Sequence, residues 1–196
     1  MIGAFQLGVI AAGRNAQVTP AAVAFVAGAT NATYSSDLRH VISNSSWATV
    51  PLSIDIPTSG KWYTEFVCDP GYSAGNGPMI GVIQSNTPQT SYLGGSGPNS
   101  ASIGVSSVRV QGSAWSALAS TGAGTSGQIV GVLVDMGTGS IRWSINGGVL
   151  SDSIALVDFP PGLPGLRFAI SSHPAYGGVA IATTPSYAPS GYTWMG

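Results

Sequence analysis

The stretch IVGVLVDMGTGSIRWSINGGVL, residues 129–150, decides the fold class because it reads as two β-strands joined by tight turns. Aliphatic and β-branched residues dominate positions 129–136, and the glycines at positions 137 and 139 permit the positive φ angles of a turn. Apolar and polar residues then alternate, which is typical of a strand with one buried face. The apolar positions of this second strand are Ile141, Trp143 and Ile145. We expect a hairpin that ends at the turn signal Asn146-Gly147-Gly148.

Similar short strands recur along most of the chain. Apolar runs bounded by Gly, Pro, Asn and Ser predict them at residues 4–12, 21–26, 32–35, 40–42, 47–56, 61–68, 79–84, 102–110, 111–118, 166–171 and 178–183. The strand at 61–68 carries large residues on both faces, which indicates a central position in a sheet. No window shows helical periodicity. This pattern predicts an all-β protein, an antiparallel β-sandwich or jelly roll.

The composition fits one glycine-punctuated domain, because 44% of the 196 residues are hydrophobic, 7% are charged and 28 are glycine. We expect the sandwich to span residues 31–196, and residues 1–30 to form an N-terminal apolar strand segment or an assembly arm. The opening MIGAFQLGVIAAG has no basic residues before its apolar run and is too short to cross a bilayer. These features favour a strand over a signal peptide and argue against membrane insertion.

Charges are few and dispersed, with six basic residues offset by seven acidic ones. Because no basic patch is present in the sequence, we expect no nucleic-acid partner. Weak self-repulsion suits a subunit packed in an assembly, so we expect a homo-oligomer. Cys68 is the only cysteine, which excludes an intrachain disulfide, and we expect it to be a small buried hydrophobe.

Several ordered motifs resemble those of the SPRY domain family, a concanavalin-like β-sandwich. They are GKWYTEF at residues 60–66, IGV at 80–82, VGVLVD at 130–135 with INGG at 145–148, and PSGY at 189–192. The sequence departs from the family pattern at Trp143, where the hairpin usually has Phe or Tyr. The resemblance implies a SPRY-like jelly roll and a non-catalytic recognition scaffold whose loops bind proteins and sometimes small ligands.

This chain has few charges, is rich in Gly, Ser and Thr, and opens with Met and a short apolar segment. In these features it resembles the members of the family that are found in the structural genes of tailed bacteriophages. The resemblance implies a non-enzymatic virion structural protein: a tail fibre, a tail tip or a capsid decoration, located in the virion. Its expected partners are capsid or tail subunits, together with a host surface protein or glycan. The alternative is a carbohydrate-binding, lectin-like module, because the same sandwich class binds sugars and aromatic side chains stack on pyranose rings.

Two glycine-rich motifs lack the local structure that enzymatic chemistry needs. Gly71-Tyr72-Ser73-Ala74-Gly75 matches the nucleophile elbow of serine hydrolases, but Asn76-Gly77-Pro78 follows where the elbow requires a helix. Residues 122–127 match G-x-G-x-x-G, yet a strand expected from about Gln128 replaces the helix that would hold a pyrophosphate. We therefore expect plain loops at both motifs, and no cofactor.

The histidines and acids do not form a recognisable catalytic set. His40 and His173 have no spacing that places them with Asp37, Asp55 or Asp158, and we expect both at the surface or at a rim. Two histidines and scattered acids also do not supply a metal-ligand cluster. A polysaccharide hydrolase would need two carboxylates that face one cleft. We expect neither enzymatic activity nor a bound metal.

Recognition is expected in the loops at residues 69–78, 85–99 and 174–178, because loops on a rigid sandwich vary without cost to the core. Exposed aromatic side chains commonly anchor interfaces. Trp194 fits packing and partner contact equally well. The candidate partner-binding residues are Tyr72, Asn76, Tyr92, Asn99, Trp115, His173, Tyr176 and Trp194.

Overall fold

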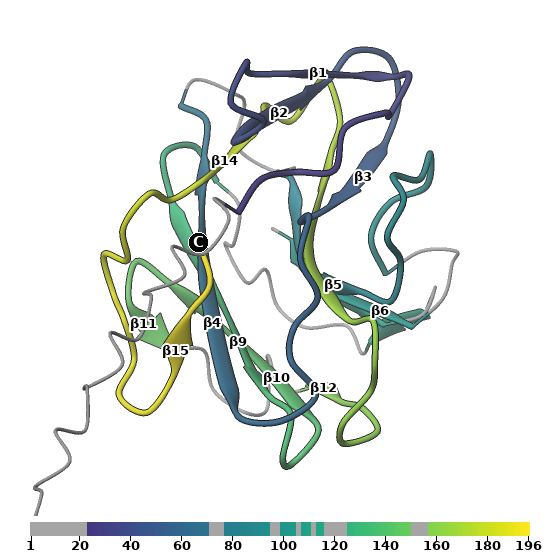
Figure 1. The fold of residues 1–196 in the computed structure, drawn as a ribbon. Helices are drawn as coiled ribbons and strands as arrows, with labels where there is room; N and C mark the ends of the chain where they lie inside the picture. Colours follow the sequence, from purple (N-terminus) through teal and green to yellow (C-terminus); the bar gives the residue numbers. More distant parts are fainter. Residues whose placement is uncertain are drawn as a thin grey trace, which may run out of the picture.

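The computed structural model describes residues 23–70, 77–94, 99–104, 107–110, 113–115, 125–149 and 157–196. Every regular element in these ranges is a β-strand, and the strands form two sheets that face each other (Figure 1). The predicted all-β antiparallel sandwich is therefore confirmed. The strand expected at 4–12 lies outside the described residues.

The first sheet has the order β1-β2-β14-β4-β9-β10-β11, with β12 paired to β10 and β15 paired to β4. Its strands are β1 (Ala32–Tyr34), β2 (His40–Ser43), β4 (Lys61–Cys68), β9 (Ile129–Asp135), β10 (Ser140–Ile145), β11 (Gly148–Val149), β12 (Val157–Asp158), β14 (Val179–Ile181) and β15 (Thr193–Trp194). The central position predicted for 61–68 is confirmed, because β4 lies between β14 and β9.

The second sheet has the order β3-β13-β5-β6-β7-β8. Its strands are β3 (Ala48–Pro51), β5 (Met79–Ile83), β6 (Ser100–Gly104), β7 (Ser107–Val110), β8 (Ser113–Trp115) and β13 (Arg167–Ser172). The segment expected as one strand at 102–110 is two antiparallel strands, since Ala101 pairs with Val110 across the turn. The strand expected at 47–56 is shorter: β3 ends at Pro51, and Leu52 after it forms an isolated bridge with Phe25.

The hairpin at 129–150 forms as the sequence predicts. Trp143 lies opposite Val132 and is fully buried, and its indole Nε1 donates a hydrogen bond to the Ile80 carbonyl of the facing sheet at 2.9 Å. Asn146 and Gly147 adopt positive φ angles of 48° and 84°, as a tight hairpin turn requires. The hairpin therefore both builds the first sheet and joins it to the second.

One hydrophobic core fills the space between the sheets, and it includes residues N-terminal to position 31. Val23 and Phe25 are buried in it, and the Phe25 ring stacks on Phe66 with centroids 6.2 Å apart. Of the strand expected at 21–26, the described part makes a single bridge between Phe25 and Leu52. Cys68 is fully buried in the same core, as predicted.

The long segment between β5 and β6 is tied to the second sheet. Gln89 forms a β-bridge with Thr49 of β3, through hydrogen bonds of 2.8 and 2.9 Å. Leu93 is buried against Ile83 and Ala169, and its carbonyl accepts a 2.8 Å hydrogen bond from Ser102 Oγ. Residues 89–93 are therefore fixed to the edge strand β3 at Thr49 and to the second sheet at Leu93.

The C-terminal segment closes the first sheet beside β4 (Figure 1). β15 runs parallel to β4, with Thr193 opposite Trp62, and the buried Met195 donates its N–H to the Tyr63 carbonyl at 2.8 Å. A strand of two residues is too short to show the alternation of apolar and polar residues, which is why the sequence did not indicate β15.

Candidate functional site

Four ring side chains gather at one end of the sandwich, next to the start of β3. The Trp47 ring lies 5.9 Å from Tyr92, 5.2 Å from His173 and 5.4 Å from Tyr176, measured between centroids. The His173 and Tyr176 rings are 4.8 Å apart. All four residues are half-buried, so each combines a packed part with an accessible part. We call these residues the Trp47 cluster.

Adjacent strands of the second sheet bring the cluster together. Trp47 immediately precedes β3, and His173 immediately follows β13, which pairs with β3 so that Ser172 lies opposite Ala48. Tyr92 reaches Trp47 because its segment is anchored on β3 at Thr49. Residues 47, 92 and 173 are far apart in the sequence and meet only through this strand order.

Hydrogen bonds hold two of the three segments that carry the cluster, those with Trp47 and with His173 and Tyr176. The Asn31 side-chain amide donates to the Trp47 carbonyl at 2.8 Å. In the turn after β13, Tyr176 N donates to the His173 carbonyl at 2.8 Å, and Ser172 Oγ donates to the Gly177 carbonyl at 2.8 Å. The rings are therefore positioned before any partner arrives, which lowers the entropy cost of binding.

The described segments that carry the cluster have no charged side chain. Residues 44–47, 85–94 and 173–177 contain no Asp, Glu, Lys or Arg, whereas Asn44, Ser45 and Ser46 beside Trp47 are exposed. The surface is thus aromatic and neutral, with amide and hydroxyl groups next to the rings. Such a surface binds through ring contact and uncharged hydrogen bonds rather than through ion pairs.

A histidine–aspartate pair lies close to this end and was not foreseen from the sequence. His40 Nε2 is 2.9 Å from both carboxylate oxygens of Asp69, and Gly178 N donates to Asp69 Oδ2 at 3.0 Å. A Cβ at Gly178 would lie 2.6 Å from that carboxylate oxygen and 2.7 Å from His40 Nε2. The pair therefore needs a glycine at position 178 and fastens the start of β14 to the loop after β4.

Among the described residues, no serine hydroxyl is bonded to the His40 ring. Ser35 contacts His40 through the main chain, because Ser35 Oγ accepts the His40 N–H at 2.9 Å. The serine motif at residues 71–75 lies outside the described residues, which stop at Pro70 just before it. Of the G-x-G-x-x-G motif, the described part leads into β9, which confirms that a strand follows it.

The buried carboxylate of Glu65 has a structural role. Glu65 is 0% exposed, and its carboxylate accepts hydrogen bonds from the Tyr63 hydroxyl at 2.5 Å and from the N–H groups of Ser186 and Tyr187 at 2.7 Å. Burial, together with the adjacent Glu65 carboxylate, raises the pKa of Tyr63 well above its usual value and keeps it a donor. Glu65 therefore anchors the segment around Ser186 and Tyr187 to β4 of the first sheet.

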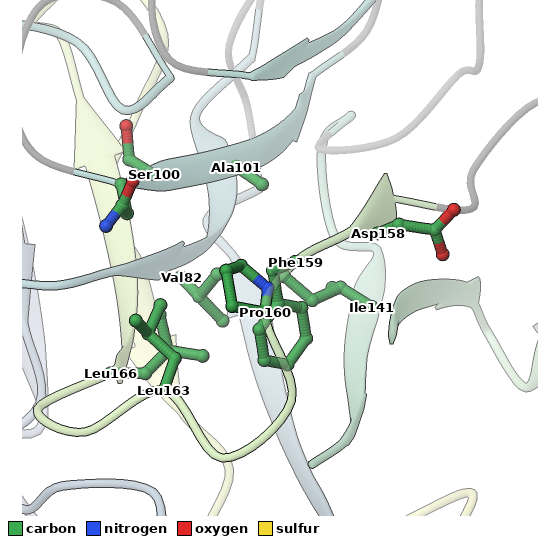
Figure 2. A pocket seen from close by; sticks show the side chains of 10 residues that line it. Val82, Ser100, Ala101, Ile141, Asp158, Phe159, Pro160, Leu163 and Leu166 are labelled. Atoms are coloured by element: carbon green, nitrogen blue, oxygen red, sulfur yellow. The ribbon is translucent and has the colours of Figure 1, made fainter. Parts of the chain in front are cut away.

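An apolar crevice opens between the two sheets near β12 (Figure 2). Its apolar walls include Val82 and Phe159, with Asn99 and Asp158 at its rim. In Figure 2 the Asp158 carboxylate points away from the Phe159 ring. Among the described lining residues Asp158 is the one acid, so this part of the crevice does not offer the carboxylate pair of a glycosidase.

The structure separates the candidate residues named from the sequence. It brings Tyr92, His173 and Tyr176 together in the Trp47 cluster. Asn99 lies at the crevice, where its side-chain amide donates to Gln84 Oε1 at 2.6 Å. The half-buried Trp194 packs on Tyr63, at 5.8 Å between ring centroids, and its part in partner contact stays a prediction.

The remaining candidates cannot be placed at a site. Tyr72 and Asn76 lie outside the described residues, and of Trp115 only its position at the end of β8 is described. Trp47, the centre of the cluster, is absent from the candidates because it was read as part of a strand at 47–56. Its signal was available in the sequence: a tryptophan directly after the Asn44-Ser45-Ser46 turn belongs to the end of the sandwich.

Other site types find no support in the described part of the chain. No group of three or more His, Cys, Asp or Glu side chains there is arranged to hold a metal ion. Nor do these residues include a helix of the length and hydropathy that crossing a bilayer requires.

Comparison with known proteins identifies the relatives of this fold. A family model described as SPRY domain matches residues 61–182. The SPRY domain of human HERC1 is similar with a TM-score of 0.56 at 14% sequence identity, covering 76% of this chain and 91% of that chain. The PSpry domain of TRIM65 has a TM-score of 0.57 at 16% identity, covering 84% of this chain and 93% of that chain. No curated protein matches the chain significantly.

Proposed function

Since the chain belongs to the SPRY domain family, we propose that it is a non-enzymatic recognition module of a bacteriophage virion that contacts its partner through the Trp47 cluster. SPRY domains generally mediate protein–protein interactions, which supports a binding role. Within the virion, the proposed role is that of a tail fibre, a tail tip or a capsid decoration that is present in several copies.

The observation that carries the binding role is the Trp47 cluster itself. Partly accessible aromatic side chains on a prearranged surface are the usual anchors of protein interfaces. In this chain they come from separate segments that hydrogen bonds and a β-bridge hold on the second sheet. Two other polar features, the Glu65 carboxylate and the His40–Asp69 pair, are engaged in fastening the chain to itself.

Composition supports the virion role. Only 7% of the residues are charged, and 28 are glycine, which suits a subunit with weak self-repulsion in a dense assembly. The test is mass spectrometry of purified virions of the phage that encodes the chain. We expect peptides of this chain at a constant ratio to the major capsid protein, and their absence from infectious particles contradicts the virion role.

A variant pair tests whether the Trp47 cluster is the contact surface. We expect Tyr176→Ala to weaken binding of the isolated protein to its virion or host partner by about tenfold or more, as loss of an aromatic anchor does. The matched control is Tyr187→Ala, which removes an exposed aromatic at the β10–β11 side of the molecule, where Tyr187 lies against Gly147. Equal losses in both variants contradict the assignment.

A further inference from the structure

We propose that the Trp47 cluster binds an uncharged sugar chain. This inference rests on the proposed recognition role and names the class of its ligand. A saccharide presents apolar C–H faces that lie against aromatic rings and hydroxyl groups that bond to neutral polar groups. The cluster and its surroundings offer both kinds of contact in one place.

The rings form an angled surface. Trp47 makes interplanar angles of 62° with Tyr92, 52° with His173 and 53° with Tyr176. Rings inclined in this way present both faces and edges, and a tyrosine or histidine ring also carries a polar group at its rim. This geometry can hold the face of one sugar ring and still bond to its hydroxyl groups.

The neutral surroundings disfavour charged ligands. The described segments 44–47, 85–94 and 173–177 contain no Lys or Arg, which nucleic acids, phosphopeptides and sulfated or sialylated glycans need for affinity. They also contain no Asp or Glu to attract a basic peptide. Beyond them, Asp69 bonds to Gly178 and is paired with His40.

The adjacent sheet edge disfavours an extended peptide. A peptide that adds a strand needs free main-chain groups at the edge. Beside the cluster, Thr49 of the edge strand β3 exchanges both of its main-chain hydrogen bonds with Gln89, at 2.8 and 2.9 Å. The side chain of Thr49 is also engaged, since its Oγ1 donates to the Ser91 carbonyl at 2.5 Å. The edge is thus already covered at Thr49, which leaves no place there for a peptide to add a strand.

The experiment follows the indole N–H signals of the full chain by NMR. The chain has five tryptophans, and Trp47→Phe assigns the signal of Trp47. The probes are maltohexaose, cellohexaose, mannohexaose and chitohexaose, each titrated to about 10 mM so that a dissociation constant of about 1 mM can be measured. A heparin hexasaccharide and a decaproline peptide serve as the charged and the peptide comparison.

We expect at least one neutral oligosaccharide to shift the Trp47 signal saturably, with an affinity that Tyr176→Ala lowers by about tenfold or more. Tyr187→Ala serves as the matched control and should leave the affinity unchanged. The proposal is overturned if none of the four neutral sugars shifts this signal, or if only heparin or decaproline does. It is also overturned if Tyr187→Ala weakens binding as much as Tyr176→Ala.

This result is separable from that of the virion experiment. If the chain is present in purified virions but no neutral sugar binds, the ligand class is wrong and the recognition role stands. If a neutral sugar binds but the chain is absent from virions, the virion role is wrong and the sugar site stands.

Discussion

At the scale of single residues, Gly131 shows how a side chain can be excluded from an ordinary strand. A Cβ at this position in β9 would lie 2.3 Å from Ser144 Oγ and 2.7 Å from a carbon of the Tyr63 ring. Tyr63 cannot move aside easily, because its hydroxyl bonds to Glu65 and its ring packs on Trp194. We expect Gly131→Ala to lower the free energy of unfolding by about 1–3 kcal/mol, measured by urea denaturation.

A matched glycine variant provides the control for that prediction. At Gly148 the nearest atom to an added Cβ is the Ile145 carbonyl oxygen at 3.4 Å, which is an ordinary contact. Gly148→Ala should therefore change the free energy of unfolding by less than about 0.5 kcal/mol. A similar cost in both variants would contradict the steric explanation at Gly131.

Asp135, at the turn between β9 and β10, makes the stability of the protein depend on pH. Burial raises the pKa of this carboxyl, but hydrogen bonds from Thr138 N, Lys61 and Gly137 N outweigh burial and hold the pKa below its usual value. Because the folded pKa is the lower one, the ionised carboxylate stabilises the protein above about pH 4, and this contribution is lost as the pH falls through the folded pKa.

The pH dependence is measured as the difference in unfolding free energy between the unmodified protein and Asp135→Asn. We expect a difference of about 1–3 kcal/mol at neutral pH that shrinks as the pH falls below about 4. A difference that is constant between neutral and acid pH would show that the charge of Asp135 has no part in the stabilisation.

At the scale of elements, β15 stabilises the first sheet more than its two residues suggest. It extends the sheet beside β4 and places Met195, which is 7% exposed, against the core. We expect Met195→Ala to cost about 2–5 kcal/mol of unfolding free energy, as large-to-small changes in a core do. Met195→Leu, which nearly conserves the volume, should cost less than about 1.5 kcal/mol. Equal costs would mean that Met195 does not fill the core.

At the scale of the whole molecule, both sheets contribute to one core, so we expect them to unfold together. Trp143 extends from the first sheet and bonds to Ile80 in the second, which couples the two layers directly. Far-UV circular dichroism and tryptophan fluorescence should therefore give the same urea midpoint. Two separated transitions would contradict a single cooperative unit.

The sequence predicted part of the candidate site and could not predict the rest. Tyr92, His173 and Tyr176 were foreseen because aromatic residues in loops of a rigid scaffold favour interfaces. Trp47 was missed because strand patterning alone does not separate the first residue of a buried strand from the residue before it. The His40–Asp69 pair was missed because it depends on β14 lying between β2 and β4.

The sequence by itself determined where most of the longer strands lie, the hairpin that begins at residue 129 and the sandwich class, because strand period and turn glycines act between residues that are neighbours in the chain. Only the tertiary structure decided where the candidate site lies. The Trp47 cluster joins residues 47, 92, 173 and 176, and their meeting depends on the pairing of β3 with β13 and on the bridge between Thr49 and Gln89. Contacts of this kind arise from long-range strand order, which local patterns do not encode.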